Sequence, residues 1–214
     1  MMDIVHKQDE FVVIEKPSGM SVHNEVNGDV VSILSEELSS TVYAVHRLDR
    51  MTSGLLLCTT RPEMICVLQE ALRTSTKKYQ AIVRGVVSSQ KGEWRHTITN
   101  TSEGRRNPRG RKQYRKSAHT SYEVLSYNQY ISMLSLTLHT GRQHQIRKHC
   151  VLAGHEIIGD TRYGDTRYQK KMQERYDFDG LFLHAYSLQF SLFTKSYDFR
   201  CVPNGWERLG LRRS

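Results

Sequence analysis

The sequence HRLDRMTSGLLL, at residues 46–57, is the most informative stretch of this chain. In it, Asp49 lies between two arginines and is followed by small hydroxyl residues and Gly54. If the backbone from Arg47 to Asp49 is extended, both side chains point to one face and Leu48 points into the core. A neighbouring guanidinium favours the ionised form of a carboxylate. The stretch therefore predicts either a catalytic carboxylate or a structural salt bridge at the end of a strand.

The elements expected around this stretch are mostly strands. Apolar runs bounded by turn residues predict strands over residues 11–15, 42–45, 54–58, 79–83, 94–99, 117–125, 131–139, 181–193 and 197–202. Helical spacing predicts helices over 29–38, from residue 60 to 72, and over 143–152, the last closed by Gly154. Strands that follow one another with few helices between them favour an α+β fold. We expect one domain over residues 1–214, with a mixed, mainly antiparallel central sheet flanked by helices and loops.

The second of these helices has a start signal in the sequence. We expect Thr60 to cap it, Pro62 to lie near its first position and Glu63 to complete a capping box. Its predicted buried face consists of three apolar residues, Ile65, Leu68 and Leu72.

The charge of the chain is strongly positive. Lysine and arginine number 31 against 22 acidic residues in 214, a formal net charge of +9. Residues 105–116, RRNPRGRKQYRK, hold seven of these basic residues and no acidic one. The segment is either a solvated loop or an arm that follows a nucleic-acid backbone and orders on contact, with Tyr114 as a stacking face. The seven residues expected on the phosphates are Arg105, Arg106, Arg109, Arg111, Lys112, Arg115 and Lys116.

The compartment is predicted from what the sequence lacks. None of the four cysteines forms a C-x-x-C pair, and three sit among apolar neighbours, so buried free thiols and a reducing compartment are expected. The N-terminus has no apolar signal-peptide core, and no apolar run approaches the roughly 20 residues of a membrane span. We expect a cytoplasmic protein without membrane contact.

A second polar run, TGRQHQIRKH, occupies residues 140–149. As the start of a helix it would place Gln143, Ile146 and Arg147 on one side, where Arg147 could reach a carboxylate or a phosphate. The histidines at 139, 144 and 149 are five residues apart and do not converge on a helix, so we expect no metal site. No phosphate-binding glycine loop and no nucleophile elbow appears, so no nucleotide cofactor is expected.

Five motifs, in order, resemble those of the RluA family of pseudouridine synthases. The resemblance spans roughly residues 11 to 193, the motif-bearing core. The matching segments are VIEKPSGMSVH at 13–23, HRLDRMTSGLLL at 46–57, KKYQAIVRG at 77–85, the 140–149 run with GDTRYG at 159–164, and LHA at 183–185.

The resemblance implies a role for individual residues. Asp49 is the catalytic aspartate, Tyr79 stacks on the target base, and Arg147 pairs with Asp49. Leu183 lines the apolar side of the pocket, although core packing is an alternative for both Tyr79 and Leu183. The two residues expected to position the RNA backbone or to support the aspartate are Arg47 and Arg142.

The resemblance also implies the reaction and the partners. Pseudouridine formation is an isomerisation of uridine in structured RNA and needs neither cofactor nor metal. Ribosomal RNA is slightly favoured as the substrate because of its frequency in the family, and transfer RNA is the alternative. An RNA-binding module without activity and a hydrolase acting on RNA are rival functions. We expect a monomer without the S4-type RNA-binding domain that many relatives carry, and a local loop change at Glu156, where the family often has proline.

Overall fold

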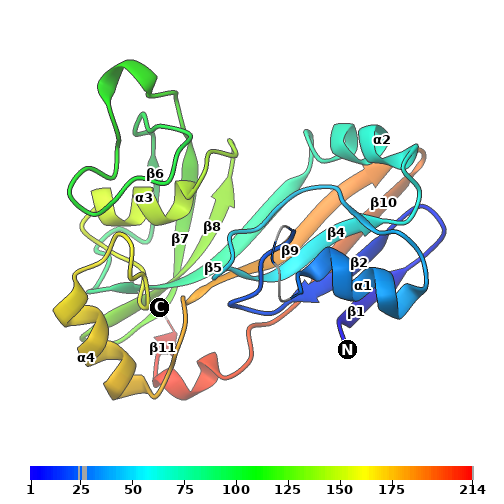
Figure 1. The fold of residues 1–214 in the computed structure, drawn as a ribbon. Helices are drawn as coiled ribbons and strands as arrows, with labels where there is room; N and C mark the ends of the chain where they lie inside the picture. Colours follow the sequence, from blue (N-terminus) through cyan, green and yellow to red (C-terminus); the bar gives the residue numbers. More distant parts are fainter. Residues whose placement is uncertain (24, 26–27, 214) are drawn as a thin grey trace. The chain divides into compact units, whose positions relative to one another are not determined.

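The computed structural model describes residues 1–23, 25 and 28–213, which form two compact units (Figure 1). Unit 1 comprises Met1–Lys77 and His184–Pro203, and unit 2 comprises Lys78–Leu183 and Asn204–Ser214. The chain passes from one unit to the other within strand β5 (Thr76–Arg84), at the first residue of strand β9 (Leu183–Leu192), and after Pro203.

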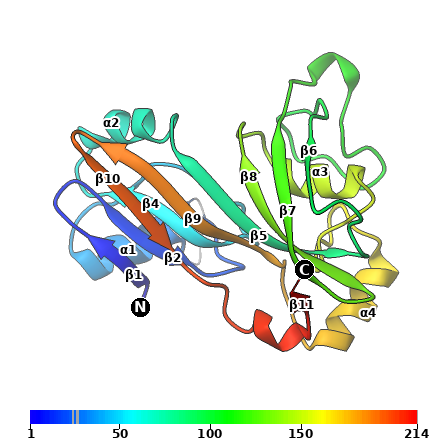
Figure 2. The ribbon, with the colours of Figure 1, turned by 180° about the vertical axis from the view of Figure 1, so that it is seen from behind.

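Unit 1 is built on four neighbouring strands. They lie in the order β1 (Asp3–Lys7), β2 (Val12–Lys16), β4 (Ser53–Thr59) and β9. The short β3 (Tyr43–Ala44) pairs with β4, and β10 (Lys195–Arg200) pairs with β9 along its length (Figure 2). All these pairs are antiparallel except β4 with β9, which run parallel. Helices α1 (Val30–Leu38) and α2 (Met64–Ala71) complete the unit.

Gly54 permits the parallel contact between β4 and β9. Its φ angle is +107°, which L-residues with a side chain rarely adopt. A β-carbon at this position would lie 2.4 Å from the carbonyl oxygen of Ala185. The glycine in the 46–57 stretch is therefore a condition for the packing of the strand that follows Asp49.

Unit 2 has its own run of neighbouring strands and its own core. Its strands lie in the order β5, β8 (Ile131–Leu138), β7 (Thr120–Tyr127) and β11 (Arg212–Arg213), and β6 (Lys91–Trp94) pairs with β7. Helices α3 (Gln145–Leu152) and α4 (Thr166–Tyr176) and two 3-10 helices, η1 (Lys112–Tyr114) and η2 (Trp206–Leu209), belong to it. Its core residues, such as Ile82, Leu134 and Phe182, form a cluster separate from the one around Phe11 and Leu57 in unit 1.

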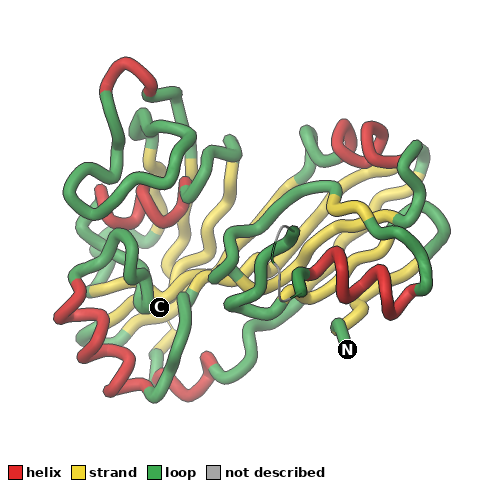
Figure 3. The backbone as a smooth tube through the Cα atoms, viewed as in Figure 1, coloured by secondary structure: helices red, strands yellow, loops and turns green. Residues whose placement is uncertain are grey.

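The fold class is confirmed, because the strands pair mainly antiparallel and helices flank them. The α-helices are short, from eight to eleven residues (Figure 3). In the described part of the chain, none has the length and apolar character needed to cross a bilayer.

Some predicted boundaries are wrong. The strand expected over 94–99 ends at Trp94, because the chain then leaves the sheet and Ile98 bridges to Lys116 in the basic segment. Strand β1 was not expected, since most of its residues are exposed and its sequence shows no apolar alternation. Helix α4 was not expected either, because only Gln169 and Met172 are buried among its eleven residues.

The predicted start of α2 is also wrong. The helix begins at Met64, and no side chain caps it. Instead Thr59 Oγ1 accepts a hydrogen bond from the Arg61 amide at 3.0 Å, and Glu63 pairs with the Arg61 side chain. The buried face is Met64, Leu68 and Leu72, with Ile65 half-buried.

The cysteines are free and mostly buried, as expected for Cys58, Cys150 and Cys201. Cys66, which follows the apolar Ile65, was also expected to be buried, and this prediction is wrong. It is exposed because it lies on the outer face of α2, away from the buried Met64 and Leu68.

Candidate active site

Asp49 lies in a tight turn between β3 and β4. Its carbonyl oxygen accepts a hydrogen bond from the Thr52 amide at 3.0 Å. Leu48 is buried, with 6% of its surface exposed, so it anchors the turn in the core as expected. Asp49 is half-buried and Arg47 is exposed. The turn thus fixes the backbone of Asp49.

Lys16 anchors this turn through hydrogen bonds from its side chain. No role was predicted for it from the sequence. Its side chain is fully buried, and its ammonium donates to the carbonyl oxygens of Pro17 and Met20, both at 2.7 Å, and of Arg50 at 3.0 Å. Loss of hydration on burial lowers the pKa of Lys16 to about 8. The negative charge of Asp49 raises this pKa and so partly offsets the effect of burial. The ammonium therefore acts electrostatically on the Asp49 carboxylate and holds the backbone beside it.

Further hydrogen bonds join the turn to the segment after β2. The Gly19 amide donates to the Arg50 carbonyl at 3.0 Å, and Arg50 Nε donates back to the Gly19 carbonyl at 2.8 Å. Ser18 Oγ donates to the Met51 carbonyl at 2.8 Å. The motif at 13–23 thus serves as a support for the turn, which keeps the catalytic candidate in one geometry.

His46 supports the chain before Asp49. Its Nε2 accepts a hydrogen bond from the Leu57 amide at 3.1 Å, so this nitrogen carries no proton. Loss of hydration on burial lowers the pKa of His46 to about 3. His46 is therefore neutral and acts as a structural link between the turn and β4.

Arg147 projects from α3 and is buried, with 7% of its surface exposed. Its Nε and Nη2 donate to the two carboxylate oxygens of Asp160, each at 2.9 Å. Asp160 also accepts from the Tyr163 amide at 3.0 Å, and the Tyr163 ring lies 5.2 Å from the guanidinium carbon. The GDTRYG motif therefore holds this arginine, a role for Asp160 that the sequence analysis did not assign.

The start of α3 is fixed by the buried amide of Gln145. Its Oε1 accepts from Thr140 Oγ1 at 2.7 Å and from the Arg142 amide at 3.1 Å. Its Nε2 donates to the His119 carbonyl at 3.0 Å and to Thr120 Oγ1 at 2.9 Å. All four hydrogen-bonding positions of the amide are used, so the turn that carries Arg142 is tied to β7.

The predicted face of this helix needs a correction. Gln143 precedes α3, which begins at Gln145, so it does not share a helical face with Ile146 and Arg147. Its amide donates instead to Asn100 Oδ1 at 2.9 Å. Arg142 is half-buried, and its Nε donates weakly to the Ser117 carbonyl at 3.4 Å.

Tyr79 and Leu183 both contact the core of unit 2. Tyr79, in β5, is half-buried and packs against the core cluster. Leu183 is 3% exposed and belongs to that cluster. Both residues therefore pack in or against the core, which was the alternative expected for them. Their contact with a substrate stays a prediction.

The two units divide the candidate residues between them. Asp49 and Arg47 belong to unit 1, while Tyr79, Arg142, Arg147 and Leu183 belong to unit 2. The pairing of Arg147 with Asp49 therefore remains a prediction.

The basic segment is partly tied to the protein. Arg105 forms an ion pair with Asp165 at the start of α4. Arg109 donates to Thr97, and Arg115 donates twice to the Gly110 carbonyl, at 2.6 and 2.9 Å. The remaining four basic side chains are exposed: Arg106, Arg111, Lys112 and Lys116.

Glu156 lies where a local loop change is predicted, and its carboxylate contacts two other segments of the chain. Glu156 Oε2 accepts from the Asp165 amide at 2.7 Å, and Oε1 accepts from Arg84 at 3.3 Å. The carboxylate therefore fixes the start of α4, which a proline could not do.

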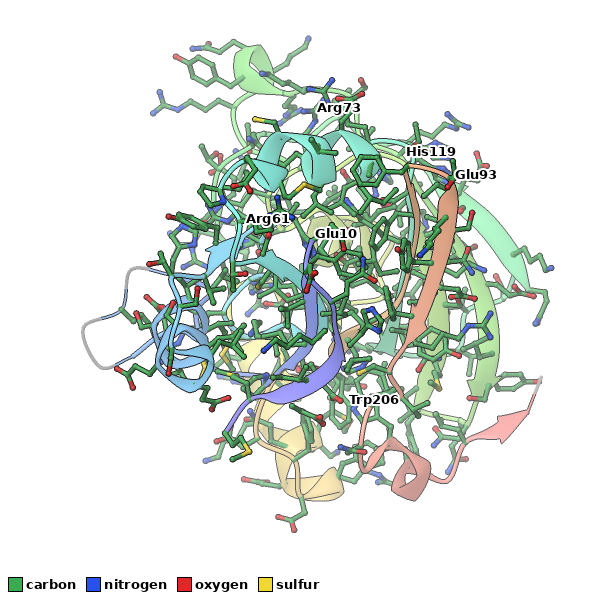
Figure 4. The ribbon with its side chains drawn as sticks, turned by 90° about the vertical axis from the view of Figure 1, so that its right-hand side faces the viewer. Glu10, Arg61, Arg73, Glu93, His119 and Trp206 are labelled. Atoms are coloured by element: carbon green, nitrogen blue, oxygen red, sulfur yellow. The ribbon has the colours of Figure 1, made fainter. Side chains whose placement is uncertain are left out.

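Histidines gather at one end of the sheet in unit 2. The rings of His119 and His139 stack at 4.0 Å, and His119 Nε2 lies 3.3 Å from the Glu93 carboxylate (Figure 4). His149 is buried, and loss of hydration lowers its pKa to about 4. His144 lies outside this group, with its Nδ1 at 2.9 Å from the Tyr163 hydroxyl.

Within the described residues, one group of side chains has the spacing of a metal site: Glu15, His184 and Cys201, whose ligand atoms lie within 4.8 Å of one another. Both ring nitrogens of His184 are at hydrogen-bond distance, from Ser53 Oγ at 2.9 Å and from the Cys201 carbonyl at 3.0 Å. Burial raises the pKa of the Cys201 thiol, which disfavours the thiolate that a metal needs. The group fits a hydrogen-bonded link between β4, β9 and β10 better than a ligand set.

Comparison with known proteins agrees with these motifs. A model of the RNA pseudouridylate synthase family matches residues 10–151. The chain is 32% identical over 208 residues to tRNA pseudouridine synthase C of Haemophilus ducreyi, covering 89% of this chain and 85% of that protein. It is 34% identical over 195 residues to ribosomal large subunit pseudouridine synthase C of Haemophilus influenzae, covering 87% of this chain and 60% of that protein.

A solved structure gives the same result. Human RNA pseudouridylate synthase domain containing 4 matches with a TM-score of 0.81 and 26% identity, covering 98% of this chain and 94% of that one. The family match includes the Asp49 turn and all of α3 except its last residue, Leu152. The chain therefore belongs to the RNA pseudouridylate synthase family, enzymes that isomerise uridine in RNA.

Proposed function

We propose that this protein forms pseudouridine at a specific uridine of a ribosomal or transfer RNA, with Asp49 as the catalytic carboxylate. The observation that carries the proposal is the support around Asp49. A turn fixes its backbone, and the buried ammonium of Lys16 interacts with its carboxylate and holds the adjacent Arg50 carbonyl. This arrangement suits a group that must be held in one geometry during a reaction.

The chemistry requires one ionised carboxylate. The C1′–N1 bond of uridine breaks, a C1′–C5 bond forms, N1 gains a proton and the proton on C5 is lost. Because atoms and electrons balance within the uridine and the solvent, we propose that no redox cofactor or metal takes part. The carboxylate can attack C1′, add to C6 or remove the 2′ proton, and all three routes start from ionised Asp49.

The target base has to leave its stack before the reaction. Extrusion costs a few kcal/mol and is cheapest in loops or distorted helices. Stacking of the extruded base on an aromatic ring contributes about 1–3 kcal/mol, which offsets this cost of extrusion. We assign that ring to Tyr79 and the apolar wall of the pocket to Leu183.

Arginines then orient the reacting groups. We assign Arg147 to pair with Asp49 through the guanidinium that Asp160 already aligns. Arg47, exposed beside Asp49, and Arg142, on the turn held by Gln145, are assigned to the RNA backbone. The exposed members of the basic segment add contacts to phosphates.

The two units together form one catalytic domain in this proposal, because the family match at 10–151 runs through both. The relatives carry the names of transfer RNA and of ribosomal RNA enzymes, and either RNA fits the proposal. We further propose that the protein acts as a monomer in the cytoplasm.

The test is pseudouridine mapping of total RNA from cells with and without the gene. We expect one site, or a small set, to disappear on deletion. Expression of the intact protein should restore it, and expression of Asp49→Asn should not. Loss of no site on deletion, or restoration by Asp49→Asn, would contradict the proposal.

A further inference from the structure

The segment that joins β6 to β7 lines an open cavity that the proposed reaction does not use. The cavity has a volume of about 440 Å³ and lies between residues 99–103 and residues 111–116. In Figure 1 this segment, drawn in green, extends beyond α3. The volume falls in the range of pockets that bind small molecules, roughly 300–1,000 Å³.

A buried charge ties one wall of the cavity to α3, and close packing joins that wall to the other. Lys148 of α3 is fully buried, and its ammonium donates to the carbonyl oxygens of Thr99 at 3.0 Å and Thr101 at 2.8 Å. Gly110 packs so closely on the other wall that a β-carbon there would lie 2.4 Å from Thr99 Oγ1. The cavity is therefore formed without a ligand, and binding requires little ordering of the chain.

One wall combines an aromatic face with positive charge. Tyr114 is 61% exposed, and Arg111 and Lys116, which line the same cavity, are exposed as well. Arg115 is held inward by the Gly110 carbonyl and keeps the turn closed. Proteins that bind unpaired nucleotides stack the base on such a ring and place the phosphate on such cations.

The opposite wall carries a carboxylate. Glu103 Oε1 accepts from Thr99 Oγ1 at 3.0 Å and from Thr101 Oγ1 at 2.8 Å. These hydrogen bonds lower the pKa of Glu103, so the group is ionised and only accepts hydrogen bonds. No hydrogen bond to Oε2 is found among the residues that the structure describes, which leaves that oxygen for a ligand.

An acceptor in this position selects between bases. Guanine presents two adjacent donors, N1–H and the N2 amino group, on its Watson–Crick edge. Adenine presents an unprotonated N1 beside its amino group, and that lone pair repels a carboxylate. Glu103 therefore favours guanine.

We propose that this cavity binds one unpaired guanosine of the substrate RNA. The base stacks on Tyr114, its Watson–Crick edge meets Glu103, and the adjacent phosphate contacts Arg111 and Lys116. The inference rests on the proposed function, since it assumes an RNA substrate, and it adds a base-specific contact besides the target uridine.

The experiment measures binding of two single-stranded hexanucleotides to the full chain by fluorescence anisotropy at fixed salt. The probes are CCGCCC and CCACCC, which lack uridine and so cannot be isomerised. We expect at least five-fold tighter binding of the guanosine probe. Tyr114→Ala should weaken binding of that probe about ten-fold, which is within the range of one lost stacking contact.

Matched variants separate stacking from base selection. Glu103→Gln retains an oxygen for Thr99 and Thr101 and should remove the preference for guanosine. Phe193→Ala, which removes an aromatic ring that is 74% exposed in unit 1, should change neither affinity. Circular dichroism of each variant checks that the fold is intact.

Equal affinity for the two probes, or unchanged binding by Tyr114→Ala, would overturn the inference. Pseudouridine formation in a structured RNA is measured in parallel. If the wild-type protein forms pseudouridine but shows no preference for guanosine, only this inference fails. If it prefers guanosine but forms no pseudouridine, only the proposed function fails.

Discussion

At the scale of single residues, the ion pair between Arg147 and Asp160 is the most enclosed charge pair of the candidate site. Their side chains are 8% and 1% exposed, and both carboxylate oxygens accept from the guanidinium. Removal of one charge from such a pair takes from the other buried charge the compensation that this partner supplied. The pair therefore contributes both to stability and to the orientation of Arg147.

We predict that Asp160→Asn lowers the free energy of unfolding by about 3–5 kcal/mol and also lowers kcat. Urea unfolding and single-turnover kinetics measure the two effects. The control is Asp198→Asn, which removes one partner of an exposed pair with Arg200 and should cost about 1 kcal/mol or less. If both substitutions lowered the free energy of unfolding equally, the buried pair would contribute no more to stability than the exposed pair.

Lys16 leads to a second prediction at this scale. Lys16→Met removes the donor to three carbonyl oxygens around the Asp49 turn while it keeps most of the side-chain volume. We expect kcat to fall by about 10- to 100-fold, the effect of displacing a catalytic group by about 1 Å. Steady-state kinetics on an RNA substrate measure it, with the exposed Lys7→Met as the control. A kcat equal to that of the control would contradict the role of Lys16.

The residues that the sequence did and did not reveal differ in a physical way. Asp49 became a candidate because two arginines and a glycine lie near it in the chain, and its catalytic role was implied only by the family resemblance. The contacts of Lys16 and Asp160 join segments more than ten residues apart, to Arg50 and Arg147. No local pattern reports such contacts, although both residues lie within motifs that the resemblance included.

At the scale of elements, the parallel contact of β4 with β9 depends on Gly54. We predict that Gly54→Ala destabilises the protein by several kcal/mol more than Gly154→Ala. Both glycines have positive φ angles, +107° and +81°, so the backbone strain of about 1 kcal/mol is similar. Only at Gly54 does a β-carbon meet backbone atoms, 2.4 Å from Ala185, whereas nothing lies within 4 Å at Gly154.

Thermal or urea unfolding of the two alanine variants checks this prediction. Far-UV circular dichroism beforehand shows whether each variant folds. A Gly54→Ala protein that is as stable as Gly154→Ala would mean that β4 and β9 can separate without loss of stability.

The elements predictable from the sequence were those with a buried face. Strands β4, β7 and β8 and helix α1 have clear apolar patterns, and all four were predicted within three residues of their observed ends. Helix α2 was predicted, but its cap was not, because Thr59 binds the Arg61 amide instead. Elements that are exposed on most sides carry no such signal.

At the scale of the whole molecule, each unit contains a neutral histidine that resists protonation. Burial lowers the pKa of His46 in unit 1 to about 3 and that of His149 in unit 2 to about 4. In the unfolded chain both titrate near 6.5. Below about pH 6.5 the unfolded state therefore binds more protons than the folded state, and stability falls as the pH decreases towards 4.

We predict that the free energy of unfolding decreases by up to about 2.7 kcal/mol per pH unit between pH 6 and pH 4 through these two groups. Urea unfolding at a series of pH values measures the slope. His46→Gln and His149→Gln should each reduce the slope by the contribution of one proton, about 1.4 kcal/mol per pH unit. A slope that both variants leave unchanged would assign the pH dependence to other groups.

In the proposed reaction, conversion of uridine to pseudouridine depends on the Asp49 carboxylate. The most direct measurement follows tritium release from an RNA transcript labelled at C5 of uridine, with nucleoside analysis of the product. We predict that the purified protein releases one tritium for each pseudouridine formed, without free uracil or strand cleavage, and that Asp49→Asn binds the RNA equally but releases none. Turnover by Asp49→Asn, or free uracil from the wild-type protein, would contradict the account.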